Sequence, residues 1–142
     1  MAAVVDVMDG DEQRGGSGPP FTRRRRILVI DDEPALATMI GRMIEDDFDV
    51  EILSDARGAL ASITAVESRP DLILCDLMMP FVSGAQLFRS ASQAVPGIEG
   101  RFVFMTGGSF TPWVVDFLAS CRRPCLEKPF GYASLRAILA AD

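Results

Sequence analysis

The sequence predicts an α/β domain of the doubly wound kind, in which helices cover both faces of a parallel sheet. Short apolar runs alternate five times along the chain with segments whose apolar residues recur at helical spacing. The runs are almost continuously apolar, which is typical of parallel strands buried on both faces. The length of 142 residues is sufficient for one such domain with a sizeable core.

The first strand is expected at "RILVI", residues 26–30, and a helix begins after it at Pro34. Proline suits a first helical turn. The apolar residues behind it recur at helical spacing, at Leu36, Met39, Ile40, Met43 and Ile44. The run "FDVEIL", 48–53, predicts the second strand, and 56–66 predicts a helix that ends before "SRP".

The third strand is expected at "DLILCD", residues 71–76, and the turn "LMMPFVSG" follows it. A helix is expected from about residue 84 to 93. The run "RFVFMT", 101–106, predicts the fourth strand. Each of these strands ends close to a polar residue.

The last part of the chain predicts one more strand between two helices. Thr111 and Pro112 form a suitable N-cap and first-turn pair for a helix that ends near Ser120. A short fifth strand is expected near 124–127 and a last helix at 131–141. Right-handed crossovers between the strands would place helices on both faces of the sheet.

Composition excludes several classes of function. The net charge of −6 argues against a nucleic-acid-binding surface over the domain as a whole. No apolar run approaches the roughly 20 residues that cross a bilayer, and the acidic N-terminus does not resemble a signal peptide. We therefore expect a cytoplasmic protein with no membrane contact. The absence of histidine excludes Ser-His and Cys-His catalysis on this chain.

The cysteines and the N-terminal segment have plain interpretations. Cys75, Cys121 and Cys125 show no disulfide-framework spacing, so we expect reduced thiols. The composition of residues 1–22, which include "GGSGPP", predicts a flexible tail before a folded domain at 23–142. The run "RRRR" before the first strand could contact nucleic acid or acidic lipid, but we favour a solvated charge run at the end of a linker.

Polar residues gather at the carboxyl ends of the predicted strands. Ligands of doubly wound folds bind outside these ends. The residues expected there are Asp31, Asp32, Glu33, Asp76, Thr106 and Lys128. Converging carboxylates repel each other, and Mg²⁺ suits a site made of carboxylates, a carbonyl and water. A nearby lysine and hydroxyl would complete a site for a phosphoryl group.

This arrangement resembles the receiver domain of two-component response regulators. The resemblance covers about residues 26–142 and depends on "VIDDEP", "LILCDLMMPFVSG", "FMTGG" and "LEKPF", which occur in that order. It implies a flavodoxin-like sheet with strand order 2-1-3-4-5. It also implies a phosphoacceptor rather than an enzyme acting on other substrates, with a sensor histidine kinase or phosphotransfer protein as donor.

The resemblance assigns a role to each motif residue. Asp76 would be the phosphoacceptor, and Mg²⁺ would be held by Asp31, Asp32, Asp76 and the backbone carbonyl of Met78. Lys128 would pair with the phosphoryl group and Thr106 would hydrogen-bond to it.

Other motif residues would shape the backbone around the site. Members of the family often have a cis peptide bond before the proline that corresponds to Pro129. Pro80 and Gly84 would shape the loop after Asp76, and Gly107 and Gly108 would allow close approach of the backbone to a phosphate. With Met78 and Gly108 near the site, no acidic side chain from these positions would position attacking water, so slow to moderate loss of the phosphoryl group is expected.

The sequence departs from the family at one position. Many members have an aromatic residue three positions before the lysine, where this chain has Cys125. A thiol cannot fill the space of a ring, so we hypothesise that output uses the helix at 112–120, with Phe110 or Trp113 as the packing element. The downstream protein partner is expected on the face formed by 112–120, 124–127 and 131–141.

Two alternatives to a phosphorylated receiver domain depend on particular residues. An aspartyl-phosphate hydrolase of the haloacid-dehalogenase type needs a second acid two residues after the nucleophile, where this chain has Met78. A pseudo-receiver that acts as a constitutive protein-interaction module remains open because of Cys125. The chain ends after its last predicted helix, so we expect no DNA-binding output domain on it.

Overall fold

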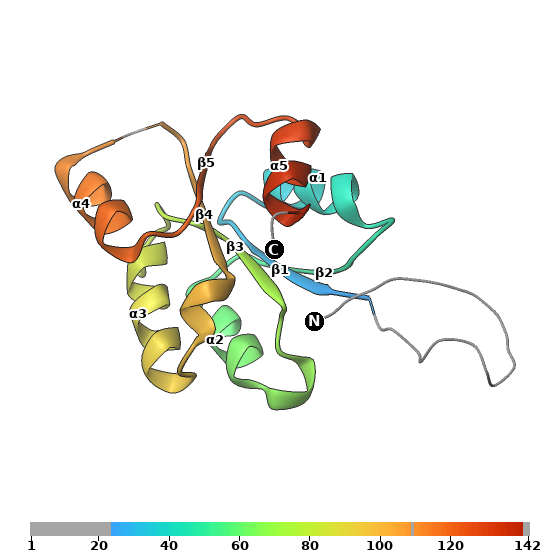
Figure 1. Ribbon diagram of the computed structural model, residues 1–142, viewed down its shortest axis with the longest axis horizontal. Coiled ribbons are helices and arrows are strands. Elements are labelled where there is room, and N and C mark those ends of the chain that lie inside the picture. Colours follow the sequence, from blue (N-terminus) through green and yellow to red (C-terminus); the bar gives the residue numbers. More distant parts are fainter. Residues whose placement is uncertain (1–23, 109, 141–142) are drawn as a thin grey trace, which may run out of the picture.

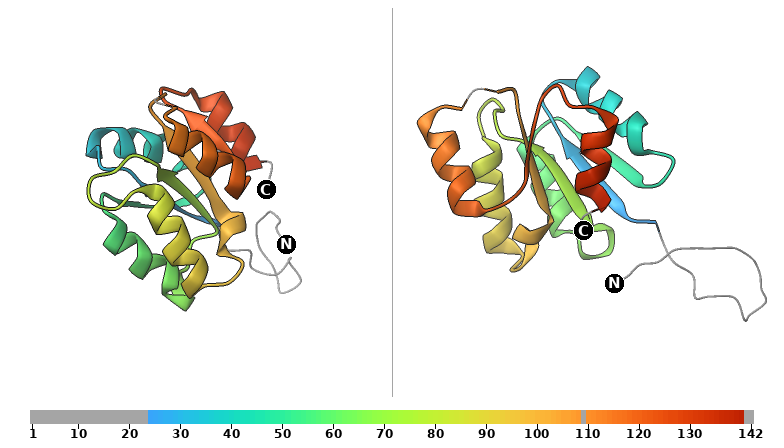
Figure 2. Two further views of the ribbon diagram at one scale, coloured as in Figure 1. Left: turned by 90° about the vertical axis from the view of Figure 1, so that its left-hand side faces the viewer. Right: turned by 45° about the horizontal axis from the view of Figure 1, so that its top comes forward.

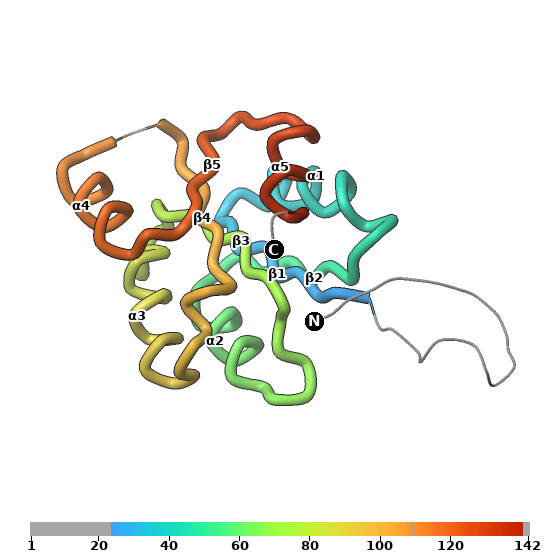
Figure 3. The backbone as a smooth tube through the Cα atoms, viewed as in Figure 1, coloured from blue at the N-terminus to red at the C-terminus, as the bar shows by residue number. Residues whose placement is uncertain are grey.

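The five expected strands form one parallel sheet with the expected strand order. The structure is a computed structural model that describes residues 24–108 and 110–140. The sheet has the order β2-β1-β3-β4-β5, and every neighbouring pair is parallel. Its strands are β1 (Arg26–Ile30), β2 (Asp49–Leu53), β3 (Leu72–Asp76), β4 (Phe102–Thr106) and β5 (Cys125–Glu127). The path of the chain, with β1 between β2 and β3, can be followed in Figure 3.

In the described part of the chain, five α-helices and two short 3-10 helices accompany the strands, and the last α-helix follows β5 (Figure 1). The α-helices are α1 (Pro34–Ile44), α2 (Ala56–Thr64), α3 (Gly84–Ala94), α4 (Pro112–Cys121) and α5 (Tyr132–Ala140). The 3-10 helices are η1 (Val66–Ser68) and η2 (Ile98–Arg101). Within the described residues, none of the helices has the length and apolar character needed to cross a membrane.

The two faces of the sheet carry separate cores, which explains the near-continuous apolar strands. On one face, α2, α3 and α4 cover the side chains of Leu28, Ile73 and Phe104. On the other face, α1 and α5 cover Val29, Leu74 and Met105. The two views of Figure 2 show these helices on opposite sides of the sheet. Because both faces are buried, β3 and β4 have no exposed residue, and their last residues are held in fixed positions.

Element boundaries differ from the expectations by at most one residue, with one larger difference. The helix expected at 56–66 ends at Thr64, and Val66–Ser68 forms η1 instead. Thr111 and Pro112 take the expected N-cap and first-turn positions, but the Thr111 side chain makes no capping hydrogen bond. Asp55 and Ser83 do cap α2 and α3, and Ser83 forms a capping box with Gln86.

Three residues of the arginine run bind main-chain carbonyls of the domain. Arg24 donates to the carbonyls of Glu45 and Phe48, which follow α1. The Arg25 guanidinium donates to the carbonyl of Leu139 in α5, and the Arg26 guanidinium to that of Glu67. Cations suit the carboxyl ends of helices, where carbonyls lack partners. Arg24 to Arg26 are thus part of the fold, while Arg23 and the segment 1–22 lie outside the described residues.

Candidate functional site

Three aspartates meet at the carboxyl ends of β1 and β3. Asp31 follows the last residue of β1, and Asp76 is the last residue of β3. Carboxylate oxygens of Asp31, Asp32 and Asp76 all lie within 4.8 Å of one another. Asp31 and Asp76 are buried, at 0% and 3% exposure, whereas Asp32 is half-buried. The sequence expectation that these three residues form one cluster is therefore correct.

Lys128 places its ammonium group between the two buried carboxylates. Its Nζ lies 3.1 Å from Asp31 Oδ2 and 3.4 Å from Asp76 Oδ2. Its backbone N–H donates to the carbonyl of Thr106 at 2.7 Å, which continues the pairing of β4 with β5. The peptide bond between Lys128 and Pro129 is cis, as the resemblance implied.

Burial and charge shift the pKa values of Asp76 and Lys128. Burial raises the pKa of Asp76 to about 6; the charge of Lys128 opposes this shift and that of Asp31 adds to it. Burial lowers the pKa of Lys128, but its hydrogen bond to Asp31 and the charges of Asp76 and Asp31 outweigh burial and raise it overall. The site therefore combines a firmly charged lysine with an aspartate whose carboxyl group would ionise fully if more positive charge were bound nearby.

Thr106 supplies a hydroxyl group without a partner. The residue is fully buried at the end of β4, and its Oγ1 has no hydrogen-bond partner in the structure. A buried polar atom without a partner is unusual, because it loses its hydrogen bonds to water on folding. Thr106 lies one residue beyond Met105, the register partner of Asp76. A group bound at Asp76 that offers an acceptor oxygen would satisfy it.

The loop after Asp76 is tied to the strand end by backbone contacts. The N–H of Met78 donates to Asp76 Oδ1 at 3.2 Å, and the N–H of Gly84 donates to the carbonyl of Leu77 at 2.9 Å. A Cβ on Gly84 would lie 2.4 Å from the carbonyl oxygen of Asp76, closer than real Cβ atoms come. Glycine is thus required at residue 84, in agreement with the role expected for it.

Two acidic residues near the site had no role in the sequence analysis. The N–H of Glu33 donates to Asp31 Oδ1 at 2.9 Å, and its carboxylate lies 3.8 Å from Lys128 Nζ. Glu127 Oε2 lies 3.0 Å from the point where a Cβ on Gly108 would be, and Gly108 has a φ of 94°. Glu33 was among the residues expected at the strand ends, without a role of its own, and position next to Lys128 is the sequence signal that could have indicated Glu127.

The acidic cluster suits a hard divalent cation such as Mg²⁺. Mg²⁺ prefers oxygen ligands and retains several waters, so one to three carboxylates and a carbonyl are sufficient. Asp31, Asp32 and Asp76 supply such oxygens within 4.8 Å of one another. The raised pKa of Asp76 indicates the same need, because a bound cation would favour its ionised form.

Cys125 packs beside the aromatic part of the core. Its register partner on β4 is Phe104, whose ring lies 5.2 Å from that of Phe117 of α4. Burial raises the pKa of the Cys125 thiol to about 11. Cys75, Cys121 and Cys125 are all free thiols, as expected. Trp113, at the start of α4, is 41% exposed and Phe110 is 50% exposed, so neither side chain is enclosed by the core.

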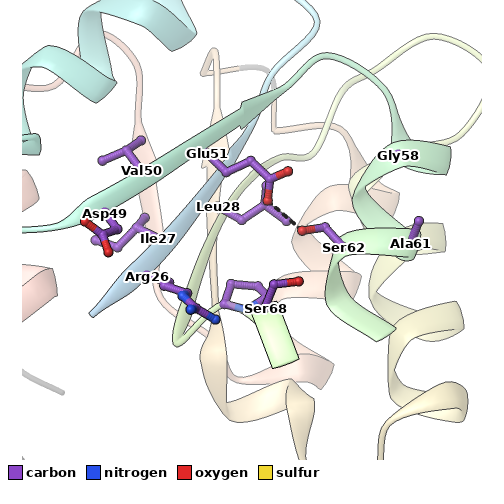
Figure 4. Close-up of a pocket in the computed structure, with 11 residues that line it drawn as sticks. Arg26, Ile27, Leu28, Asp49, Val50, Glu51, Gly58, Ala61, Ser62 and Ser68 are labelled. Carbon is purple, nitrogen blue, oxygen red and sulfur yellow. Dashed lines mark hydrogen bonds between the residues drawn. The ribbon is translucent and has the colours of Figure 1, made fainter. Parts of the chain in front are cut away.

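A separate pocket lies at the other end of the first two strands. Its lining includes Arg26, Asp49, Glu51 and Ser62, and a hydrogen bond of 2.6 Å joins Ser62 to Glu51 (Figure 4). These residues belong to the amino-terminal halves of β1 and β2 and to α2. The pocket is therefore distinct from the acidic cluster, which lies at the carboxyl ends of the strands.

Comparisons with known proteins agree with this arrangement. A family model described as the response regulator receiver domain matches residues 27–140. The DNA-binding response regulator MtrA of Mycolicibacterium smegmatis is 38% identical over 112 residues, which are 77% of this chain and 46% of MtrA. The transcriptional regulatory protein BtsR of Escherichia coli is 28% identical over 116 residues, or 81% of this chain and 46% of BtsR. The chain thus spans about half the length of these curated relatives.

Solved structures show the same fold. A response regulator receiver domain protein from Clostridium thermocellum superposes with a TM-score of 0.69 at 26% identity, covering 82% of this chain and 92% of that one. A CheY-like receiver domain protein from Methanospirillum hungatei gives a TM-score of 0.74 at 23% identity, covering 84% and 93%. At that identity, the second likeness concerns the fold alone.

Proposed function

This chain belongs to the response regulator receiver domain family, and on that premise we propose that Asp76 is its phosphoacceptor. Receiver domains are the phosphoacceptors of two-component signalling. One observation carries the assignment to Asp76. The carboxylate of Asp76 is buried, lies 3.4 Å from Lys128 Nζ and shares a cluster with Asp31 and Asp32, beside the unpartnered hydroxyl of Thr106.

The reaction follows from the groups around Asp76. A carboxylate oxygen attacks the phosphorus of a phosphohistidine, the new O–P bond forms, and the P–N bond to the leaving imidazole breaks. Mg²⁺, held by Asp31, Asp32, Asp76 and the carbonyl of Met78, would neutralise charge on the phosphoryl oxygens and the carboxylates. Lys128, which contacts Asp76, would then pair with the transferred phosphoryl group as its counter-ion, and the Thr106 hydroxyl would donate a hydrogen bond to a phosphoryl oxygen.

Phosphorylation then changes the balance between two arrangements of the domain. The phosphoryl group adds a charge of about −1.5 to −2. Because Thr106 gains the acceptor that it lacks, the end of β4 is drawn towards Asp76. We propose that the face formed by α4, β5 and α5 then binds a downstream protein, and that Trp113 at the start of α4 repacks in this change.

The remaining parts of the proposal concern context. The receiver domain would extend over 23–142, with 1–22 as a tail, and would act in the cytoplasm without direct contact to nucleic acid or membrane. Its donor would be a sensor histidine kinase or a phosphotransfer protein. A second candidate, a pseudo-receiver that binds partners without phosphorylation, is favoured only by the thiol of Cys125 at the usual aromatic position.

The expected phosphoryl lifetime follows from the side chains near Asp76. Met78 offers an apolar side chain that is 44% exposed, and Gly108 offers none. Neither can position water for attack on the phosphoryl group, so we expect slow to moderate loss. A lifetime of seconds in the purified protein would contradict this expectation.

Intact-mass measurement tests the proposed function. The protein is incubated with phosphoramidate and Mg²⁺, and we expect the mass increase of one phosphoryl group. Asp76→Asn should show no increase. Asp46→Asn, which removes an exposed carboxylate beyond the end of α1, should behave as the wild type. An unchanged wild-type mass would favour the pseudo-receiver.

A further inference from the structure

We propose that Phe81 is a docking residue for the protein that donates the phosphoryl group, and that this donor presents apolar side chains beside its phosphohistidine. This inference rests on the proposed function of Asp76. It goes further because it assigns recognition of the donor to one side chain outside the acidic cluster.

Phe81 has a strained backbone. Its φ is 68°, in the left-handed region that bulky residues rarely adopt. The N–H of Val82 donates to the carbonyl of Pro80 at 2.7 Å, so Phe81 is the central residue of a three-residue turn. The form of this turn with a positive central φ is the rarer and more strained one. Glycine would relieve the strain, yet this chain has an aromatic residue.

Nothing in the fold accounts for this strain. Arg122 is the other described non-glycine residue with a positive φ, and it ends α4 with its N–H bonded to the carbonyl of Leu118. That is an ordinary helix ending. Phe81, in contrast, is fully exposed, at 102%. Its ring contributes no burial to the domain that could offset the strain, which favours a role for the ring in contact with another molecule.

The loop that carries Phe81 exposes two more apolar side chains. Met78 and Val82 of the same loop are 44% and 38% exposed. We refer to Met78, Phe81 and Val82 as the apolar tip. Exposed aromatic residues surrounded by other apolar side chains are typical of protein-binding sites.

The apolar tip lies where a protein donor must approach. The loop that carries it begins at Asp76 and returns to it, because the N–H of Gly84 bonds to Leu77 and the Gly84 Cα abuts the Asp76 carbonyl. A phosphohistidine imidazole that reaches Asp76 brings its own protein surface against this loop. A small phosphodonor molecule reaches the same carboxylate without that surface.

The negative charge around Asp76 favours an apolar contact with the donor protein. Asp31, Asp32 and Glu33 repel an incoming phosphoryl group unless cations compensate them. Apolar burial attracts the donor protein without adding charge to the site. We therefore expect the donor to bear apolar side chains on the surface around its phosphohistidine.

The experiment compares two kinds of donor on the same variants. Histidine kinases of the source organism are autophosphorylated with ATP, and the one that phosphorylates the wild-type chain fastest serves as the protein donor. Phosphoramidate with Mg²⁺ serves as the small donor. For Phe81→Gly we expect the second-order rate of protein-donor transfer to fall about tenfold, the effect of removing a central interface aromatic. The phosphoramidate rate should stay within about twofold, and the melting temperature should be equal or higher because glycine relieves the strain.

Two variants serve as controls. Phe81→Trp keeps a ring and should retain most of the protein-donor rate. Val66→Ala removes an apolar side chain that is 79% exposed in η1, before the opposite end of β3, and should leave both rates unchanged.

The possible outcomes separate the two proposals. Equal protein-donor rates for the wild type and Phe81→Gly would overturn the docking role, as would equal losses with both donors. A wild-type dimer that Phe81→Gly dissociates would assign the apolar tip to a second copy instead, and would also overturn it. A wild-type chain that accepts phosphoryl groups from phosphoramidate but from neither a kinase nor a kinase-phosphorylated phosphotransfer protein would contradict the docking role alone. Failure with phosphoramidate itself would contradict the proposed function.

Discussion

The Lys128 ammonium group lies 3.4 Å from a carboxylate oxygen of Asp76, although the two residues are 52 positions apart. The contact exists because β3 and β5 end at the same edge of the sheet, separated by β4. The same ammonium lies 3.1 Å from Asp31. One cation is therefore shared by two buried carboxylates.

Removal of Lys128 should destabilise the domain in metal-free buffer. Lys128→Met leaves Asp31 and Asp76 buried without their cation, and we expect the free energy of unfolding to fall by about 2–4 kcal/mol. Adding Asp76→Asn removes one of the stranded charges, so the double variant should lose less than the sum of the two single changes. Urea denaturation of all four proteins measures this. Strict additivity would mean that Lys128 and Asp76 are not coupled.

Gly84→Ala should be destabilising because of a backbone contact. Its Cβ would lie 2.4 Å from the Asp76 carbonyl oxygen, and backbone atoms cannot move aside as a flexible side chain can. We expect a loss of about 1–3 kcal/mol in the free energy of unfolding. Gly100→Ala is the matched control, because its Cβ would meet nothing within 4 Å. Equal stability of the two variants would show that the loop after Asp76 packs less closely than described.

Thr106→Val should separate stability from signalling. The Oγ1 atom is buried without a partner, so an apolar group of the same shape should leave the free energy of unfolding unchanged or raise it by about 1 kcal/mol. The fluorescence of Trp113, the single tryptophan, should change on phosphorylation of the wild type but not of the variant. A loss of stability above about 2 kcal/mol would indicate that Oγ1 already has a partner.

The Cys125 thiol should react slowly at neutral pH. Its pKa is raised from 9.0 to about 11, so the reactive thiolate is scarce below that value and its share rises about tenfold per pH unit from pH 8 to 10. Short exposure to iodoacetamide followed by peptide mapping should show this rise. In the urea-unfolded protein the rate should level off near pH 9 to 10. The same profile for folded and unfolded protein would contradict the burial of Cys125.

The fold and the site residues could be predicted because they depend on local patterns. Continuous apolar runs identify β1, β3 and β4, and the parallel arrangement then brings the polar residues at the carboxyl ends of the strands together. Asp31 follows β1, Asp76 is the last residue of β3, and Lys128 follows the short strand β5. Their meeting therefore requires no knowledge of side-chain packing.

Other features depend on contacts that the sequence does not encode locally. The arginines at 24–26 read as a solvated run, but their guanidinium groups bind carbonyls up to 114 positions away. Thr111 has a capping residue type without forming the cap. The left-handed conformation of Phe81 runs against its residue type, so no propensity could indicate it.

The most direct test of the account locates the phosphoryl group. Borohydride reduces an aspartyl phosphate to homoserine, and tandem mass spectrometry of the protein treated with phosphoramidate, Mg²⁺ and then borohydride identifies the residue converted. We predict homoserine at residue 76 alone, and none in a sample without phosphoramidate. Homoserine at residue 31 or 32, or a phosphorylated protein with Asp76 unconverted, would contradict the assignment of Asp76 as the phosphoacceptor.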